Sequence, residues 1–326
     1  MTTRRQLLAV LGAGLLTAPR ATFAQQQKVH RIGFLGAASA SSWAREVEAL
    51  RAGLRDLGYV EGKTFVLEPR WAEGRYERFP DLVADLLAAR VDVIVTHATP
   101  GTLAAKRATS TVPIVVAHAG DVVATGIVSN LARPGGNITG SSFFSPELSA
   151  KRLELLKQAV PRASRVAVLA NPQTPITKAD LEVMAATAQA LSLTLEVFEV
   201  RGSGELADAF RAMAARRVDA VTVLQDGMLN ANTAAIAELA AAHRFPSTGF
   251  KQFAEAGGLI GYGVDFLAMY RRAAHYVDRI LKGARPGELA MERPTRFELV
   301  INRATAKALG VAIPQQLLLQ ADKLLD

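Results

Sequence analysis

The stretch IGFLGAASASSWAREVEALRAGLRDLG, residues 32–58, decides the fold class of this chain. It begins with a short apolar run, residues 32–35, that is typical of a buried β-strand. Five apolar residues then follow at spacings of four, three, four and three, which places them on one face of a helix. They are Trp43, Val47, Leu50, Leu54 and Leu57. Gly58 ends this helix in the way that a glycine after a C-cap does.

The same alternation of short apolar strands and amphipathic helices continues along the chain. Further strands are expected near residues 65–67, 91–95, 113–117, 165–170, 193–200, 218–224 and 245–250. Several of these runs are apolar enough to be buried on both faces, which favours parallel sheets with right-handed crossovers. We therefore predict an α/β protein with two doubly wound, three-layer α/β/α lobes.

A hinge of several crossings is expected between the two lobes. The turn-rich segment ARPGGNITG, residues 132–140, separates the two halves, and we interpret residues 138–142 as a first crossing. The helix that carries Phe266 and Tyr270 should pack back on the first lobe, and residues 297–301 should cross again. The predicted organisation is an N-terminal lobe of residues 29–142 plus 262–294 and a C-terminal lobe of residues 143–261 plus 295–326.

The first 24 residues have the three parts of an export signal. Arg4 and Arg5 form a positive region, an apolar run of about a dozen residues follows, and small residues lead up to Ala24. The run is too short for the ~20 residues that span a bilayer. We expect cleavage near Ala24 and a periplasmic protein that does not span the membrane. The two arginines leave the twin-arginine and the general secretory routes both open.

The composition excludes several classes of function. The net charge is +8, but Arg4, Arg5 and Arg20 fall in the predicted signal, which leaves +5 on the rest of the chain. These charges are interleaved with Asp and Glu, so no nucleic-acid partner is expected. The chain has no cysteine, which excludes disulfides, a thiolate zinc site and a lipid anchor on an N-terminal cysteine.

Catalytic and cofactor motifs are missing from the sequence. It contains no P-loop, no zinc-protease motif and no nucleophile elbow, and its five histidines lack metal-ligand spacing. His97 and His118 end predicted strands, where they fit hydrogen bonding or pocket lining better than general-base catalysis. We therefore expect no enzyme activity, no cofactor and no metal.

Polar residues instead gather after the predicted strands, where two facing lobes would present them to a ligand. These stretches are residues 39–42, 96–99, 118–121, 171–174 and 225–227. Hydroxyls and amides there can donate to carboxylate or carbonyl groups, and the same residues also suit helix caps. No Arg or Lys stands at these strand ends, which disfavours a multiply charged anion and favours an amino acid or an aromatic acid.

Several stretches together resemble the substrate-binding proteins of ABC transporters with the type I periplasmic-binding-protein architecture. They are GIVSNLARPGGNITG at 126–140, RVAVLANP at 165–172, GGLIGYG at 257–263, RRAA at 271–274, ILKGA at 280–284, PTRFELVIN at 294–302 and TAKALG at 305–310. The resemblance covers essentially all of the chain after the signal. One departure is Asp121-Val122-Val123, where the family often has Asp-Pro-Val, and the loss of that proline frees the backbone beside the predicted pocket.

The resemblance implies a two-lobed protein that closes on a small molecule by a hinge motion. Its pocket would draw on Ser41, Thr96, Thr99, Asp121, Ser142, Asn171, Thr174, Asp226 and Tyr262. The implied function is capture of a small organic ligand for an ABC permease, whose transmembrane subunits would be the partner of a monomeric binding protein. Replacing Asp226 or Thr99 with Ala should weaken ligand binding and leave unfolding nearly unchanged.

Three other classes of function were compared with this one. A receptor module that senses a ligand and signals to a membrane partner could use the same fold. A hydrolase of the α/β class needs an activated nucleophile, which the sequence does not offer. A sugar-responsive repressor would begin with a helix-turn-helix where this chain has the signal pattern.

Overall fold

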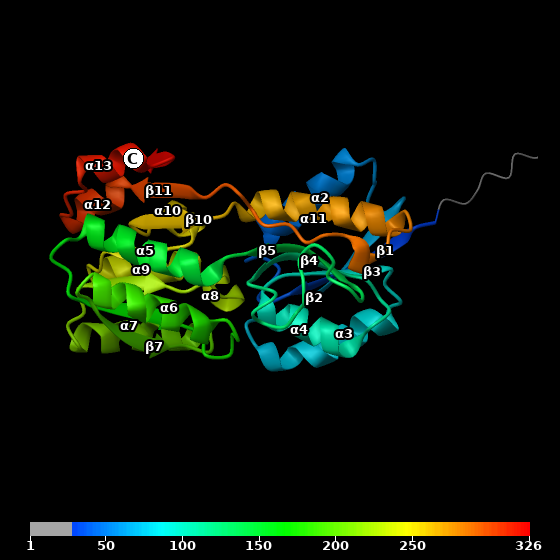
Figure 1. Ribbon diagram of the computed structural model, residues 1–326, viewed down its shortest axis with the longest axis horizontal. Helices are drawn as coiled ribbons and strands as arrows, with labels where there is room; N and C mark the ends of the chain where they lie inside the picture. Colours follow the sequence, from blue (N-terminus) through cyan, green and yellow to red (C-terminus); the bar gives the residue numbers. More distant parts are fainter. Residues whose placement is uncertain (1–27) are drawn as a thin grey trace, which may run out of the picture.

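The computed structural model describes residues 28–326 as two α/β lobes that lie side by side (Figure 1). The expected signal, residues 1–24, falls outside the described residues. The first lobe contains a five-stranded parallel sheet in the order β2-β1-β3-β4-β5. Its strands are β1 His30–Gly36, β2 Phe65–Trp71, β3 Val93–Thr96, β4 Ile114–Gly120 and β5 Ile138–Phe143.

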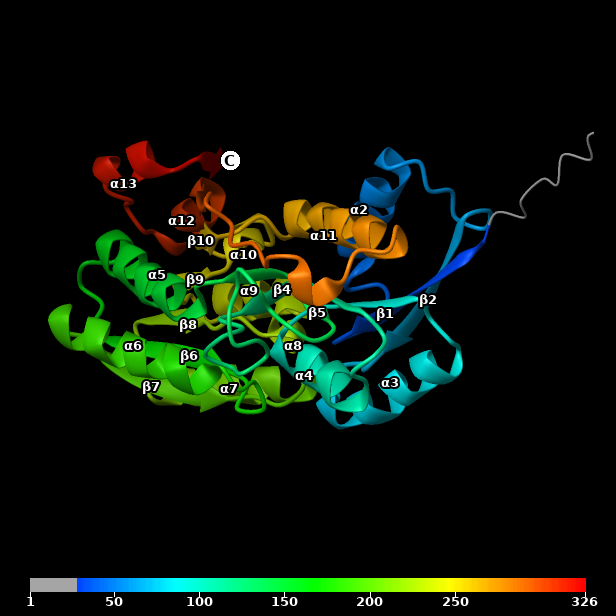
Figure 2. The same ribbon diagram turned by 45° about the vertical axis from the view of Figure 1, so that its right-hand side comes forward.

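Helices cover both faces of this first sheet (Figures 1 and 2). One face carries α2 (Ala44–Asp56) and α11 (Phe266–Leu281), and the other carries α3 (Phe79–Ala88) and α4 (Thr99–Ala108), with the short helix η1 (Tyr76–Arg78) before α3. Ile94 and Val95 are neighbours in β3 but belong to opposite core clusters, as the two-residue period of a strand requires. The three-layer arrangement predicted for this lobe is confirmed.

The second lobe is built on a seven-stranded sheet in the order β12-β11-β10-β9-β8-β6-β7. Its strands are β6 Arg165–Ala170, β7 Thr194–Glu199, β8 Ala220–Val223, β9 Ser247–Gly249, β10 Ile260–Gly263, β11 Glu298–Asn302 and β12 Lys323–Leu325. The pairing of β10 with β11 is antiparallel, whereas the other pairs are parallel. The last two strands therefore run antiparallel to the rest of the sheet, which the alternation of strands and helices does not predict.

Helices also sandwich the second sheet. Its main helices are α5 (Ser145–Ala159) and α6 (Thr177–Ala190) on one face and α7 (Leu206–Ala215) and α9 (Thr233–Ala242) on the other. The shorter helices are η2 Ser203–Glu205, α8 Gly227–Ala231, α10 Lys251–Glu255, α12 Arg303–Leu309 and α13 Gln315–Gln320, and η3 Pro286–Glu288 precedes the last crossing. The second lobe is therefore also an α/β/α unit.

The chain crosses between the lobes three times: after β5, after β10 and before β11. The first and third crossings lie side by side, because Ser142 N–H donates to the Glu292 carbonyl at 2.9 Å and Glu292 N–H donates to the Gly140 carbonyl at 3.0 Å. Tyr262 and Gly263 still pair within the second sheet, so the second crossing starts after Gly263 and not at residue 262. The division into lobes as independent units stays a prediction.

The return of α11 to the first lobe is confirmed. This helix packs so closely on α2 that a Cβ on Gly53 would lie 2.8 Å from the Cβ of Ala274. The second crossing leads directly into α11. Because α11 packs on the first lobe, the end of this crossing is held there. Within residues 28–326, no helix combines the length and the apolar character needed to cross a membrane.

Candidate functional site

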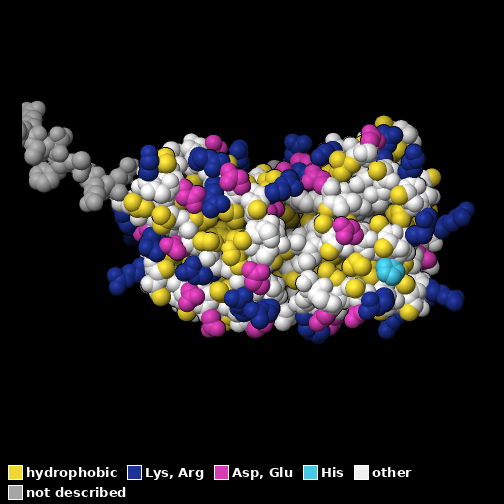
Figure 3. Space-filling view, turned by 180° about the vertical axis from the view of Figure 1, so that it is seen from behind, with side chains coloured by type: hydrophobic (Ala, Val, Ile, Leu, Met, Phe, Trp, Pro, Cys, Tyr) yellow, Lys and Arg dark blue, Asp and Glu magenta, His cyan; other side chains and the backbone are white. Residues whose placement is uncertain are grey.

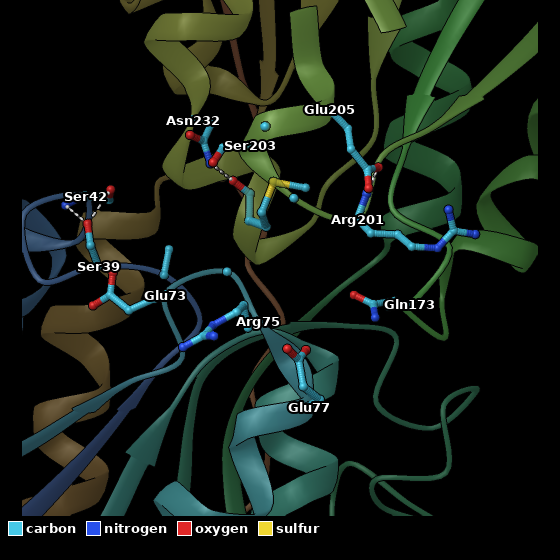
Figure 4. Close-up of a pocket in the computed structure, with 15 residues that line it drawn as sticks. Ser39, Ser42, Glu73, Arg75, Glu77, Gln173, Arg201, Ser203, Glu205 and Asn232 are labelled. Carbon is cyan, nitrogen blue, oxygen red and sulfur yellow. Dashed lines mark hydrogen bonds between the residues drawn. The ribbon is translucent and has the colours of Figure 1, made fainter. Parts of the chain in front are cut away.

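A polar cavity of about 560 Å³ lies between the two lobes (Figure 4). The first lobe lines it with Ala38, Ser39, Ser42, Glu73, Gly74, Arg75 and Glu77, and the second lobe with Gln173, Arg201, Gly202, Ser203, Gly204, Glu205, Met228 and Asn232. Seen from behind, the two halves meet along a groove, and cationic and anionic side chains are mixed over that face (Figure 3). Both lobes therefore contribute polar groups to one cavity.

Charged side chains of both signs line this cavity. Arg75 stands between Glu73 and Glu77 in the loop that follows β2 (Figure 4). On the opposite lobe, Arg201 pairs with Glu199 at 3.1 Å, and Glu205 accepts the backbone N–H of Arg201 at 2.8 Å. Basic side chains therefore line the cleft, although none stands at the strand ends from which the class of ligand was predicted. Arg75 and Arg201 follow β2 and β7, two strands after which no polar cluster is predicted.

Asp226 connects several elements at the edge of the cleft. Its Oδ1 accepts the backbone N–H groups of Met228 and Leu229 at 2.9 and 3.0 Å, which caps α8, and the Asn171 amide at 3.3 Å. Its Oδ2 accepts the Thr174 hydroxyl at 2.5 Å. The carboxylate is buried and saturated by protein donors, so in this arrangement it holds structure together and offers no free oxygen to a ligand.

Tyr76 closes the cleft from the first lobe. Its hydroxyl donates to Asp226 Oδ2 at 2.7 Å and accepts the Met228 N–H at 2.9 Å. Burial, with the Asp226 carboxylate second, raises the pKa of this phenol well above its ordinary value, so the hydroxyl keeps the proton that it donates. Beside it, a Cβ on Gly227 would lie 2.7 Å from the Cβ of Ala37 in the first lobe. The two lobes are in direct contact here.

The second lobe brings three of the nine predicted site residues together. Asn171, Thr174 and Asp226 share one hydrogen-bond network, in which Asn171 Oδ1 also accepts the Gln173 N–H at 3.0 Å. Gln173 lies in the same loop and lines the cavity. The predicted stretch 171–174 thus reaches the cavity through Gln173, a neighbour of the predicted residues Asn171 and Thr174.

The first lobe uses its predicted residues mainly inside its own structure. Thr96 Oγ1 donates to the Leu35 carbonyl at 3.2 Å, and Ser142 Oγ accepts the Val122 N–H at 3.3 Å. Ser41 is exposed, and its Oγ lies 3.0 Å from Ser39 Oγ. Thr99 is buried as the first residue of α4. The Oδ1 of Asp121 accepts the N–H groups of Val123 and Ala124 at 3.0 and 3.1 Å. None of these side chains lines the cavity between the lobes.

Tyr262 lies outside the cavity as well. It is half-buried in β10, where its ring packs against Phe297 with 6.3 Å between ring centroids. Burial raises the pKa of its phenol above the ordinary value. This geometry fits packing at the hinge better than a flat face for a ligand. The nine residues stay predictions as ligand contacts.

His97 and His118 belong to a buried row of stacked rings beside the strand ends. The ring centroids of Trp43 and His97 are 3.9 Å apart, those of His97 and His118 are 5.6 Å apart, and those of His118 and Phe266 are 4.3 Å apart. Burial lowers the pKa of His97 well below its ordinary value and that of His118 to about 3. Both rings are therefore neutral near pH 7.

The hydrogen bonds of His97 assign its tautomer. Its Nε2 accepts the Ala37 N–H at 3.1 Å, so the ring proton sits on Nδ1, which is 2.5 Å from the Tyr270 hydroxyl. Both ring nitrogens are engaged by the protein, which fits the hydrogen-bonding role expected for this residue. Within residues 28–326, no group of three or more His, Asp or Glu side chains is arranged to hold a metal ion.

Tyr76, Arg75 and Arg201 are site residues that the sequence reasoning missed. Arg75 and Arg201 lie in loops after the outer strands, and Tyr76 is the buried first residue of η1. No periodicity or motif distinguishes these residues in the sequence. Tyr76 becomes recognisable only because its hydroxyl meets Asp226, which is 150 positions further along the chain.

Comparison with known families settles what kind of protein has this architecture. The model of one family, described as ABC transporter substrate binding protein, matches residues 32–325. The chain belongs to this family. As a member of the ABC transporter substrate-binding proteins, it is a solute-binding protein by family. Its two-lobed fold and the resemblance found in the sequence are both confirmed.

Relatives of this family member include proteins with named ligands. The chain is 24% identical to a tyrosine-binding protein of Clostridioides difficile over 260 residues. This alignment covers 79% of this chain and 74% of that protein. An ABC domain from Streptococcus pneumoniae, solved in complex with L-Trp, is 25% identical with a TM-score of 0.83. A conserved domain protein from Vibrio cholerae is 27% identical with a TM-score of 0.84. Each of these two structures covers 91% of this chain, and this chain covers 100% of each.

Proposed function

We propose that this chain is a periplasmic solute-binding protein that captures a small organic molecule between its lobes and presents it to an ABC permease. The observation that carries the proposal is the cleft itself, because both lobes line one polar cavity and touch at Tyr76 and Asp226. A ligand that contacts both walls binds best when the lobes are closed, so it shifts the population toward the closed form. That closed form is the surface a permease would recognise.

An amino acid or an aromatic acid is the proposed class of ligand. The tyrosine-binding relative and the L-Trp complex support this class. The cavity supports a polar or charged ligand too, because it carries the basic side chains Arg75 and Arg201 and acidic side chains such as Glu73.

Binding without catalysis is part of the proposal. Both ring nitrogens of His97 are occupied, and Asp226 is saturated by donors, so neither residue is free to act as a general acid or base. The chain would act as a monomer after export and cleavage near Ala24.

A ligand screen tests the proposal directly. Purified protein is melted in the presence of L-amino acids, aromatic acids, sugars and short peptides, and each compound that shifts the melting temperature is recovered and analysed for turnover. A ligand at a hundredfold excess over its Kd stabilises the protein by about 2.7 kcal/mol. A stabilising compound that is recovered unchanged supports the proposal. Conversion of that compound, or the lack of any shift across the panel, contradicts it.

Small-angle scattering tests the closing motion with the same ligand. The radius of gyration should fall when the ligand is added to open molecules and should not change for compounds that fail to shift the melting temperature. N-terminal sequencing of the exported protein tests cleavage near Ala24.

A further inference from the structure

Helix α5 buries a polar face, which is unusual for a helix packed on a sheet. Ser145, Leu148, Ser149 and Arg152 are spaced three, one and three apart, so they lie on one side of the helix. Arg152 is 1% exposed, and Ser145 and Ser149 are each 1% exposed. A buried charge is stable only when an opposite charge or a full set of hydrogen bonds compensates it.

Within residues 28–326, the hydrogen-bond partners of the Arg152 guanidinium are neutral. Its Nε donates to the Tyr262 carbonyl at 2.8 Å and its Nη2 donates to Gln225 Oε1 at 3.3 Å, whereas its Nη1 has no partner among these residues. The Nε2 of the same Gln225 amide is also buried and without a partner. Among residues 28–326, no carboxylate lies within the 4.0 Å of an ion pair with Arg152. Two neighbouring side chains thus hold donors that lack an acceptor.

Asp180 on α6 has the opposite deficit. Its Oδ2 accepts the Ser145 hydroxyl at 3.2 Å, whereas its Oδ1 is buried without a partner, as is the hydroxyl of Ser149. Asp180 is 1% exposed, and no described cation lies within ion-pair distance of it. Burial raises the pKa of this carboxyl to about 7, and the Ser145 hydroxyl and the charge of Arg152 oppose this rise only in part.

We propose that Arg152, Gln225 and Asp180 form the part of the binding site that holds the charged head group of an α-amino acid. The Arg152 and Gln225 donors would take the α-carboxylate, and Asp180 with Ser149 would take the α-ammonium group. A zwitterion supplies both missing charges at once and leaves the net charge of the buried cluster unchanged, which neither a simple acid nor a simple amine does. This inference rests on the proposed function.

The position of the cluster supports this role, because it lies where the lobes meet. Gly120, at the end of β4 in the first lobe, is so close that a Cβ there would lie 3.2 Å from the Cβ of Ser145. Gln225 directly precedes Asp226, the residue that Tyr76 contacts across the cleft. Separation of the lobes would therefore remove this cover from the cluster, and closure would bury it.

An apolar ring surface lies next to the cluster and suits the side chain of such a ligand. Phe143, Phe250 and Phe266 form one core cluster with Leu148, which stands on the polar face of α5. The His118 ring stacks on Phe266, and the buried Nε2 of His118 has no partner. An aromatic or large apolar side chain can pack against these rings while His118 Nε2 accepts or donates one hydrogen bond.

The test compares amino acids with analogues that lack one charge. Each common L-α-amino acid is screened by thermal shift on the purified full chain, and the strongest binder is then compared by calorimetry with its deaminated and decarboxylated analogues. For L-tryptophan these analogues are indole-3-propionate and tryptamine. We expect each analogue to bind about 100-fold more weakly than the amino acid, because each leaves one buried charge unpaired.

Variants then assign the two charges to residues. Arg152→Met and Gln225→Met should weaken the amino acid about 100-fold and affect tryptamine little. Asp180→Asn should weaken the amino acid and bring its affinity close to that of indole-3-propionate. Arg165→Gln, an exposed arginine of the same lobe, is the matched control and should bind as the parent does. Circular dichroism melting identifies any variant that fails to fold, and the analogue series on the parent chain needs no variant.

The outcomes separate this inference from the proposed function. Equal affinity for the amino acid and either analogue overturns the zwitterion site, as does unchanged binding by folded Arg152→Met protein. Binding of an aromatic acid or a sugar without binding of any amino acid also overturns it, while solute capture stands. A panel without a single binder overturns both.

Discussion

At the residue scale, the buried carboxylate of Asp226 joins elements on both sides of the cleft through its hydrogen bonds. Its two oxygens accept five hydrogen bonds, from Asn171, Thr174, Tyr76 and two backbone N–H groups of α8. Removal of the carboxylate would leave these buried donors without an acceptor, and each unsatisfied donor costs about 1–3 kcal/mol. The sequence-based expectation of unchanged unfolding therefore does not suit this residue.

We predict that Asp226→Ala lowers the free energy of unfolding by about 3 kcal/mol, because several donors lose their acceptor together. Urea denaturation of the ligand-free protein measures this change. Asp208→Ala, at an exposed position on α7, is the control and should stay within about 0.5 kcal/mol of the parent. An Asp226→Ala protein that unfolds like the parent would contradict the structural role given to this carboxylate.

Tyr76 has a different role, because its hydroxyl belongs to the contact between lobes. In Tyr76→Phe the Met228 N–H keeps Asp226 Oδ1 as its acceptor, so no donor is stranded and the fold should remain stable. Loss of the hydroxyl should weaken the closed form by about 1 kcal/mol. We expect a larger radius of gyration by small-angle scattering of the ligand-free protein.

Tyr59→Phe is the matched control for this prediction. Tyr59 also donates its hydroxyl to a carboxylate, Asp278 Oδ1 at 3.1 Å, but both residues belong to the first lobe. Its radius of gyration should equal that of the parent. If both variants expand, or if neither does, the Tyr76 contact does not control closure.

At the scale of elements, the packing of α5 against α6 buries a titratable group. Asp180 of α6 faces Ser145, Ser149 and Arg152 of α5, with Glu147 also nearby. Desolvation is the main cause that raises its pKa to about 7, and the Glu147 charge adds to it, while Arg152 and the two serines oppose it. The folded state thus binds a proton at pH values where an unfolded aspartate has lost it.

This proton makes the stability of the ligand-free chain depend on pH. Between about pH 4 and pH 7 the unfolded Asp180 is ionised and the folded one is protonated, so the free energy of unfolding falls as the pH rises, by roughly 1.4 kcal/mol per unit at most. Below that window both states are protonated, and above it both are ionised, so this contribution then stays constant. Asp180→Asn should remove this part of the slope.

Urea denaturation at pH 4.5, 6 and 7.5 measures the effect. The stability of Asp180→Asn relative to the parent should increase across that series, whereas Asp208→Asn should follow the parent at each pH. Parallel curves for Asp180→Asn and the parent would show that the Asp180 proton does not couple to folding.

At the scale of the whole molecule, closure depends on how near α8 can come to the first lobe. Gly227 begins α8, and a Cβ there would lie 2.7 Å from Ala37 Cβ and 3.2 Å from the Tyr76 hydroxyl. Gly227→Ala should therefore hold the lobes apart without straining either lobe. We expect an increased radius of gyration and weaker binding of any ligand that the parent binds, measured by calorimetry.

Gly202→Ala is the control for this steric effect. Gly202 also lines the wall of the cleft, but a Cβ there would meet no atom within 4 Å. This variant should keep the affinity and the radius of gyration of the parent. Normal closure of the Gly227→Ala protein would show that α8 does not limit the approach of the lobes.

Local patterns in the sequence are enough to predict the architecture. Hydrophobic spacing in residues 32–58 predicts the first strand and helix, which the structure has as β1 and α2, and the same periodicity predicts the strands β3, β4, β6, β7 and β8. These patterns are local, because each type of element has a fixed period of side-chain direction. The apolar residues that face the core therefore recur at that period within the element itself. The family was also recognisable, since its motifs are continuous stretches of chain.

Which polar residues meet at the cleft depends on how distant segments of the chain pack together. Asp226 is at a strand end, as predicted, yet its ligand-binding capacity is taken up by Tyr76, Thr174 and Asn171. Arg152 looks like an ordinary surface residue of an amphipathic helix until α5 packs with that face inward. The physical reason is that a hydrogen bond or an unpaired buried charge depends on which distant segments desolvate a side chain together, and local spacing carries no record of that.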